Sequence, residues 1–320
     1  MRHKNPQERR CSYLVPLEKA AACLDETRSL ASYLSMLAVA DCEVIVLDAS
    51  PGEVYEEHHR ALRWVGRHLP VPAGVDKARI ATELAACEKV ILAGEQVRYT
   101  PADLEQMCAL LDGHEVVEPQ DYFDPLPWWG GIDAGRMLVH RGIEPYPDHG
   151  ATFGFRRSAL RGLRGLEPEG GEDAVRRLAA QGAEVFSAND VFIQRQPPPF
   201  SAWLSERPRQ ADDDFSMPVK SAFFFALIPM TLLLAMIGGI RIASGYAGAV
   251  AFASTMLAIR GRIGAAPFFP LRACLFAPLW VLERSVSVYW ALLRKVRGVT
   301  AEPTLPVPTR ARGTQVASGE

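Results

Sequence analysis

The turn Gly94-Glu95-Gln96 directly follows an apolar run at residues 90–92. Carboxylates at the end of a buried strand can hold a hard divalent cation against a diphosphate, because such cations prefer charged oxygen ligands. This turn offers one carboxylate, on Glu95, and a neutral amide, on Gln96. It therefore predicts at most a weak Mg²⁺ or Mn²⁺ site.

Other polar residues also follow short apolar runs. Glu18 follows a run at 13–15, and Asp48 ends a run at 43–47. Ligands of parallel sheets bind outside the carboxyl ends of the strands. Polar groups there can orient a nucleobase, although Asp48 also fits a plain turn residue. Residues expected along this edge are Glu18, Asp48, Glu95, Gln96, Gln120 and Asp121.

Apolar runs and helical patterns alternate through the first half of the chain. This alternation predicts an α/β fold, with a parallel or mixed sheet covered by helices. Helices are expected at about 17–38, 54–65, 77–86, 103–111 and 132–141. Strands are expected at 13–15, 43–47, 68–69, 90–92, 115–117, 184–186 and 191–193.

Charge is distributed unevenly along the 320 residues, whose net charge is −2. That balance favours no nucleic-acid partner. Segments of about 221–240 and 242–259 contain no charge, and each is long enough to cross a bilayer as a helix. We expect a transmembrane hairpin whose ends, near Lys220 and Arg260, face the cytoplasm. The alternative is a pair of buried core helices.

A third apolar stretch, 268–294, is interrupted by prolines and charges. It fits a spanning, re-entrant or interfacial element, and we favour the last two, because Trp280, Tyr289 and Trp290 suit the headgroup level. The N-terminus lacks the apolar run of a signal peptide, so the preceding domain is expected to stay in the cytoplasm.

Cysteine and histidine residues show no metal-binding spacing. The six cysteines form no Cys-X-X-Cys pair and are expected to be buried, reduced thiols. His58 and His59 lie in a charged helical segment and are expected to be solvated. Asp212-Asp213-Asp214 precedes the apolar region and fits a solvated acidic run better than a metal motif.

Five short motifs follow one another along the chain. They are 14–18 (Leu-Val-Pro-Leu-Glu), 43–50 ending in Leu-Asp-Ala-Ser, Lys77 with the strand to 94–96, 154–160 followed by Gly171-Glu172-Asp173, and Arg207-Pro208-Arg209-Gln210. With the apolar hairpin, they give a chain that resembles family-2 inverting glycosyltransferases with an A-type nucleotide-sugar fold. The resemblance is strongest to membrane-tethered bacterial members and covers residues 11 to about 300.

The resemblance implies roles for particular residues. Asp173 would be the catalytic base, with Glu172 as second choice, although both also fit a helix N-terminus. The donor would bind at Pro16, Glu18, Asp48, Lys77, Glu95 and Gln96. The acceptor or product diphosphate would bind at Arg207, Arg209 and Gln210, which also fit basic anchors at lipid headgroups. Trp128-Trp129 and Tyr122-Phe123 fit core or interface positions better than a sugar platform.

The family places Asp-X-Asp where this chain has Gly94-Glu95-Gln96. Three outcomes follow: a weak site for Mg²⁺ or Mn²⁺ at Glu95, charge neutralisation by Lys77 or Arg98, or binding without transfer. The expected function is transfer of a sugar from a nucleoside-diphosphate donor to a hydroxyl of a lipid or glycan acceptor. Because one hairpin is small for a secretion channel, we favour single over processive transfer.

The expected organisation has five parts. A flexible N-terminus covers 1–10, a glycosyltransferase domain covers 11–205, and a juxtamembrane linker covers 206–218. The membrane region covers 219–297, and a disordered tail covers 298–320. The resemblance implies a multi-pass protein of the bacterial inner membrane that acts in cell-envelope polysaccharide synthesis, with its soluble domain in the cytoplasm. The alternative is a degenerate glycosyltransferase-fold protein that binds nucleotide or acts as a membrane scaffold.

Overall fold

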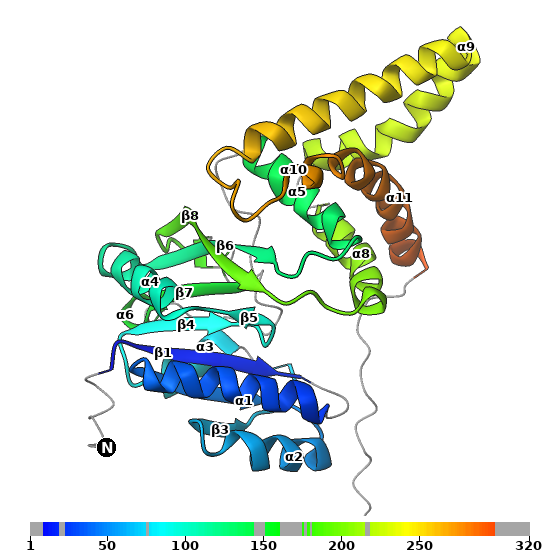
Figure 1. Cartoon of the computed structure of the whole chain (residues 1–320). Helices are drawn as coiled ribbons and strands as arrows, with labels where there is room; N and C mark the ends of the chain where they lie inside the picture. Colours follow the sequence, from blue (N-terminus) through cyan, green and yellow to red (C-terminus); the bar gives the residue numbers. More distant parts are fainter. Residues whose placement is uncertain are drawn as a thin grey trace, which may run out of the picture.

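A single mixed sheet organises the first two thirds of the chain (Figure 1). The computed structural model describes residues 9–18, 23–74, 77–143, 151–160, 175, 178–179, 181–214 and 218–297. The eight strands have the order β3-β2-β1-β4-β7-β6-β8-β5. They are β1 (Cys11–Leu17), β2 (Cys42–Asp48), β3 (Arg67–Pro70), β4 (Lys89–Ala93), β5 (Val97–Arg98), β6 (Val116–Phe123), β7 (Thr152–Arg156) and β8 (Val185–Arg195).

Strands β3, β2, β1 and β4 are mutually parallel. The centres of β1, β2 and β4 are nearly continuous apolar runs, as expected for strands that are covered on both faces, whereas β3 is a short edge strand in which only His68 is buried. Strand β7 is antiparallel to both β4 and β6, while β8 runs parallel to β6. Because β6 and β8 have the same direction as β4, the carboxyl ends of six strands lie at one edge of the sheet.

Helices cover both faces of the sheet. On one face, α1 (Leu24–Val39) and α4 (Pro101–Gly113) pack over Tyr13 and Val15. On the other, α3 (Lys77–Leu84) packs over Leu14 and Ile45. Since side chains of a strand alternate between faces, β1 contributes to both cores. Helices α2 (Gly52–Leu62) and α6 (Arg157–Leu160) complete this part of the chain.

Helix α4 begins directly after the β4–β5 turn. Thr100 accepts a hydrogen bond from the Asp103 backbone at 3.2 Å, and the Asp103 carboxylate accepts one from the Thr100 backbone at 2.7 Å. Pro101 occupies the first helical turn, where its missing N–H costs no hydrogen bond. This capping box fixes the end of the loop that carries Glu95 and Gln96.

The C-terminal region packs on α5 (Gly130–Ile143) and α8 (Phe200–Asp214). Helix α9 (Pro218–Gly261) consists of two helices that turn back at Gly239, where φ is 71° and ψ is 178° (Figure 1). That backbone conformation is available essentially only to glycine. Among the described residues, one helical segment, Val219–Gly261, is long enough and apolar enough to cross a membrane. Of its most apolar stretch, 6% is buried.

Helices α10 (Leu271–Cys274) and α11 (Ala277–Val296) follow the hairpin. One face of α11 packs against α5, α8 and α9, and Trp280 and Arg284 are buried there. The other face of α10 and α11 is apolar and exposed. Its large exposed residues are Leu271, Leu275, Leu279, Leu282, Val286, Trp290, Leu293 and Val296.

The predicted fold class is confirmed: a mixed sheet flanked by helices, followed by an apolar helical hairpin. Several boundaries differ from the prediction. The segments 184–186 and 191–193 belong to one strand, β8, and β7 lies in a segment for which no strand was predicted. Residues 119–123 extend β6, and α8 crosses the predicted boundary at 205–206.

Two expectations about polar residues are corrected. His58 is 2% exposed and contacts Asp48, so the prediction that it is solvated is wrong. Trp280 is buried and Tyr289 donates a hydrogen bond to the Phe225 carbonyl at 2.6 Å, so of the three aromatic residues only Trp290 faces outward.

Candidate functional site

The edge formed by the carboxyl ends of β1, β2, β3, β4, β6 and β8 is the candidate site. Glu18 lies directly after β1 and is exposed, whereas Pro16 is half-buried within β1 and pairs with Leu47. The turn Gly94-Glu95-Gln96 follows β4, the strand that pairs with β1 in the sheet. The sheet therefore brings these predicted donor residues to one edge, as parallel strand ends require.

The Gly94-Glu95-Gln96 turn is fixed by backbone hydrogen bonds. Gly94 N–H donates to Ala151 O at 3.0 Å, and Val97 N–H donates to Gly94 O at 3.0 Å. Gln196 N–H donates to Gln96 O at 2.8 Å. Both side chains that could face a ligand, those of Glu95 and Gln96, are half-buried on this fixed turn.

Arg98 is the cation next to this turn. Its Nη1 donates to Glu95 O at 2.6 Å, and its Nη2 donates to Gln196 Oε1 at 3.1 Å. The guanidinium lies 4.8 Å from the centre of the Tyr33 ring. Burial lowers the pKa of Arg98, but an arginine begins so far above neutrality that it stays charged. A positive charge is thus held at the edge where a diphosphate would need one.

Tyr33, whose ring lies under the Arg98 guanidinium, belongs to a hydrogen-bonded group of tyrosine residues. Tyr33 Oη accepts a hydrogen bond from Tyr99 N–H at 2.7 Å and lies 3.1 Å from Tyr13 Oη. Tyr99 Oη lies 2.9 Å from Thr152 Oγ1. Burial raises the pKa of Tyr33 to about 12, so it is neutral and can donate. Sequence reasoning missed this network, because its members come from four separate elements.

Asp48 is a buried acceptor rather than an open one. Its Oδ1 accepts from Ser50 N–H at 2.9 Å, and its Oδ2 lies 2.8 Å from His58 Nδ1 and 2.9 Å from His68 Nε2. Burial acts to raise the pKa of Asp48, but hydrogen bonds from His68, Ser50 and His58 outweigh it and hold that pKa well below its ordinary value. Asp48 is 1% exposed and anchors the loop after β2.

Histidine and tyrosine rings extend the Asp48 cluster. His59 Nδ1 lies 3.0 Å from His68 Nδ1, and Tyr55 stacks on His68 at 4.7 Å between ring centres. The His68 imidazole thus links Asp48, through Nε2, to His59, through Nδ1. The cluster fixes β3 and α2 against the end of β2.

The predicted residue Arg207 lies inside α8 and is 2% exposed. Its guanidinium contacts Asp133 of α5, with Nη1–Oδ1 2.9 Å and Nη2–Oδ2 3.2 Å, and lies 4.3 Å from the Trp203 ring centre. Burial acts to raise the pKa of Asp133, but Arg136 and Arg207 outweigh it and lower that pKa. Arg207 thus joins two helices and does not face a lipid headgroup.

For five other predicted site residues, the side chain lies outside the part of the chain that the structure describes. Glu172 and Asp173 lie outside the described residues. Lys77 begins α3, and Arg209 and Gln210 lie in α8, but their side chains also lie outside the description. Among the described aromatic residues, Trp129 is buried against Trp203, and Trp128 is 71% exposed beside Phe200.

Residues Gln120 and Asp121, which were expected at a strand end, lie within β6. Asp121 is buried and pairs with Arg195 at 3.2 Å. Gln120 Oε1 accepts from Arg141 Nη1 at 2.9 Å. Both therefore hold β6 to its neighbours β8 and α5.

A divalent metal does not fit the described protein ligands well. Glu95 is the single carboxylate of the turn, and the described residues contain no group of three His, Cys, Asp or Glu side chains that could hold a metal ion. Hard divalent ions take several oxygen ligands. Arg98 is the described cation beside this turn.

Comparisons with known proteins find similar folds only among solved structures. No family model matches the chain, and no curated protein matches its sequence. The mannosyltransferase PcManGT from Pyrobaculum calidifontis, solved with GDP-Man and Mn²⁺, is 18% identical, with 89% of each chain covered and a TM-score of 0.49.

Two further solved structures show a weaker likeness. Glucosyl-3-phosphoglycerate synthase from Mycobacterium tuberculosis, solved with Mn²⁺, UDP and glucosyl-3-phosphoglycerate, is 18% identical, with 61% of this chain and 75% of that chain covered and a TM-score of 0.38. S. aureus TarS 1-349 is 14% identical, with 90% and 91% covered and a TM-score of 0.35. Values this low identify no activity for this chain.

Proposed function

We propose that this chain is a membrane-anchored inverting glycosyltransferase that moves a sugar from a nucleoside-diphosphate donor to a hydroxyl of a lipid-linked or glycan acceptor. The observation that carries the proposal is the arrangement of Glu95, Gln96 and Arg98 on a fixed turn at the carboxyl edge of a mixed sheet. That edge is where α/β sheets bind nucleotides.

The donor would lie along this edge. Glu18 and the loop anchored by Asp48 would contact the base and ribose, while Pro16 shapes the end of β1. Lys77, Glu95 and Gln96 would contact the diphosphate or the sugar. Arg98 would offset the charge of the departing diphosphate, since its guanidinium is held beside the turn by Glu95 O and Gln196.

Inverting transfer needs a base beside the acceptor. Asp173 is the proposed base, with Glu172 as its alternative, and it would take the acceptor proton as the hydroxyl oxygen attacks the anomeric carbon. The carbon–oxygen bond to the diphosphate breaks on the opposite face of the sugar. Arg207 would act by fixing α8, which carries Arg209 and Gln210 as candidates for the product diphosphate.

Membrane anchoring would place this edge near lipid-linked acceptors. The α9 hairpin would cross the bilayer, and the exposed apolar face of α10 and α11 would lie in the interface. Arg241 lies just beyond the Gly239 turn. In the double variant Arg241→Cys/Cys23→Ser, a membrane-impermeant maleimide should label Cys at position 241 only from the side of the membrane opposite the cytoplasm. Native Cys23, which is exposed, should react only from the cytoplasmic side.

The main test is a donor-panel assay of the detergent-solubilised full chain, with and without Mn²⁺. Wild type should transfer or hydrolyse one nucleoside-diphosphate sugar, and Asp173→Asn should lose at least ~100-fold in kcat. Asp25→Asn is the matched control, since its side chain is 96% exposed on α1. Equal activity of Asp173→Asn and wild type would show that the base is misassigned.

The alternative function is nucleotide binding or membrane scaffolding without catalysis. The single carboxylate at Glu95 favours it, because one carboxylate and a neutral amide offer a divalent ion few charged oxygen ligands. Calorimetry of a nucleoside diphosphate distinguishes the two. Metal-independent binding with no turnover of any donor supports the alternative, and no binding at all supports a purely structural membrane component.

A further inference from the structure

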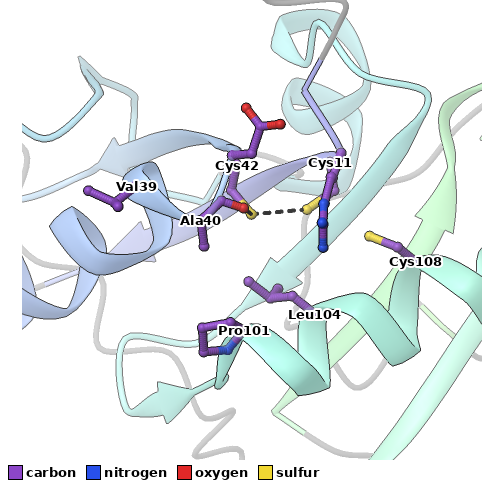
Figure 2. A pocket seen from close by; sticks show the side chains of 9 residues that line it. Cys11, Val39, Ala40, Cys42, Pro101, Leu104 and Cys108 are labelled. Atoms are coloured by element: carbon purple, nitrogen blue, oxygen red, sulfur yellow. Dashed lines mark hydrogen bonds between the residues drawn. The ribbon is translucent and has the colours of Figure 1, made fainter. Parts of the chain in front are cut away.

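Three thiols meet at the edge of the sheet opposite the candidate donor site. Cys11 begins β1, Cys42 begins β2, and Cys108 lies on α4. Figure 2 shows the three side chains around one pocket. The pocket has a volume of about 360 Å³ and is also lined by Arg10, Asp41 and Leu104, among others. A space of this size admits water and small solutes.

Cys11 and Cys42 are placed for direct bonding. They are register partners on parallel strands, and their Sγ atoms lie 3.4 Å apart as free thiols (Figure 2). Neighbouring strands are about 4.8 Å apart, which is within the Cα separation that a disulfide bridges. Only a small movement of the two side chains is needed to join the sulfur atoms.

Hydrogen bonding and burial shift the pKa values of the three thiols in different directions. The hydrogen bond from Cys11 lowers the pKa of Cys42, although burial opposes it. The same kind of bond, with Lys89 and Arg10 nearby, lowers the pKa of Cys108. The pKa of Cys11 is raised by its hydrogen bonds to Cys108 and Cys42 and by burial. A thiolate is the reactive form of cysteine.

We propose that Cys11 and Cys42 form a reversible dithiol that a small hydroperoxide oxidises within this pocket. The Cys42 thiolate attacks one peroxide oxygen, the O–O bond breaks, and the departing oxygen leaves as water or an alcohol after taking a proton. Cys42 is then a sulfenic acid. Cys11 attacks its sulfur, its thiol proton leaves with the sulfenic oxygen as water, and the Cys11–Cys42 disulfide forms.

The other cysteines of the chain define the alternative disulfides that compete with the Cys11–Cys42 bond. Cys108 is the third member of the cluster. Cys87, whose pKa is raised chiefly by burial, donates to Arg9 O at a sulfur–oxygen distance of 3.6 Å. Cys23 is exposed on the approach to α1, and Cys274 is buried in α10. The proposal assigns the bond to Cys11 and Cys42 alone, and it is independent of the proposed function.

The test uses the full chain, reduced and then treated with hydrogen peroxide. Remaining thiols are blocked after unfolding, and the peptides are mapped by mass spectrometry. We expect the free thiols to fall from six to four, with a cross-linked peptide pair that contains Cys11 and Cys42 and has lost two hydrogen atoms. Dithiothreitol should restore all six.

Variants provide the controls. Cys11→Ala should remove the cross-link and leave Cys42 as a sulfenic acid that a dimedone probe traps, formed more slowly than in wild type because the hydrogen bond with Cys11 is lost. Cys274→Ala should leave the cross-link unchanged. The wild-type map does not depend on how well a variant folds. A Cys11–Cys108 or Cys42–Cys87 cross-link, or oxidation confined to Cys23, would overturn the proposal.

Discussion

Arg207 and Asp133 form a buried, two-bond ion pair that joins α8 to α5, with Nη1–Oδ1 2.9 Å and Nη2–Oδ2 3.2 Å. The Trp203 indole N–H also donates to Asp133, and the Arg207 guanidinium lies over the Trp203 ring. Both helices pack on α11. The pair therefore fixes the sheet domain to the apolar C-terminal region.

Breaking this pair should destabilise the protein strongly. Arg207→Met removes two hydrogen bonds to the buried Asp133 carboxylate and leaves Arg136, whose Nε lies 3.4 Å from Asp133 Oδ1, as its neighbouring cation. The loss should cost ~3 kcal/mol in the free energy of unfolding. The double variant Arg207→Met/Asp133→Leu removes both charges and should recover part of that loss. Thermal unfolding in detergent, followed by tryptophan fluorescence, measures both.

The matched control for Arg207 is Arg60→Met, because Arg60 is exposed on α2 and should cost less than ~0.5 kcal/mol. If Arg207→Met unfolds at the same temperature as Arg60→Met, the pair does not stabilise the junction. In that case a direct ligand role for Arg207 gains weight.

The Asp48 cluster predicts an acid-sensitive contribution to stability. The folded-state pKa of Asp48 is depressed, so its contribution is complete above the unfolded pKa of about 3.9 and is lost as pH falls towards the folded pKa. Asp48→Asn cannot accept as a carboxylate from His58, His68 and Ser50. It should cost ~2 kcal/mol at pH 7, since one or more buried donors lose their acceptor.

The difference between wild type and Asp48→Asn should therefore shrink below about pH 4. Chemical unfolding followed by circular dichroism from pH 7 to pH 3 measures it. Asp190→Asn is the control, because its side chain is 95% exposed and should show no such pH dependence. A constant difference across this range contradicts the assignment.

The sequence predicted where strands end more accurately than it predicted the contacts of the residues at those ends. The runs at 43–47 and 90–92 gave strands β2 and β4, because continuous apolar residues favour buried parallel strands. Asp48 was correctly placed at the end of β2. Its binding to His58 and His68 was not predicted, since those contacts cross to α2 and β3.

Long-range contacts also explain what was missed among the cysteines. Cys11, Cys42 and Cys108 are far apart in the chain and have no spacing pattern, so they looked scattered. The parallel register of β1 and β2 brings the first two together.

The predicted runs at 184–186 and 191–193 are separated in the sequence by Asn189 and Asp190, yet both belong to β8 and pair with β6 around a register shift.

Arg98 should contribute to nucleoside-diphosphate binding. Arg98→Ala removes the cation next to the Gly94–Gln96 turn and should weaken binding by ~10–100-fold, as expected for loss of a charged hydrogen bond to phosphate. Arg98→Lys keeps the charge but not the two-pronged contact with Glu95 O and Gln196, so it should recover only part.

Calorimetry with a nucleoside diphosphate measures these affinities. Arg79→Ala is the control, because Arg79 is a 72% exposed residue on α3 that forms an ion pair with Glu83. If Arg98→Ala binds as tightly as Arg79→Ala, Arg98 only supports the turn, and the diphosphate is neutralised elsewhere.

The last prediction concerns the single carboxylate of the turn. Gly94→Asp/Gln96→Asp would place two further carboxylates beside Glu95 and should raise Mn²⁺ affinity by ~10-fold or more, because divalent affinity rises with ligand charge. An added Cβ at Gly94 would lie 3.4 Å from Ala151 O, so the turn can accept it. Gly113→Asp, in open space at the end of α4, is the control. Manganese binding by electron paramagnetic resonance and metal-dependent turnover are measured together. Tighter Mn²⁺ binding with higher turnover would mean that the natural turn limits catalysis, whereas tighter binding with unchanged turnover would mean that Arg98 already meets the charge requirement.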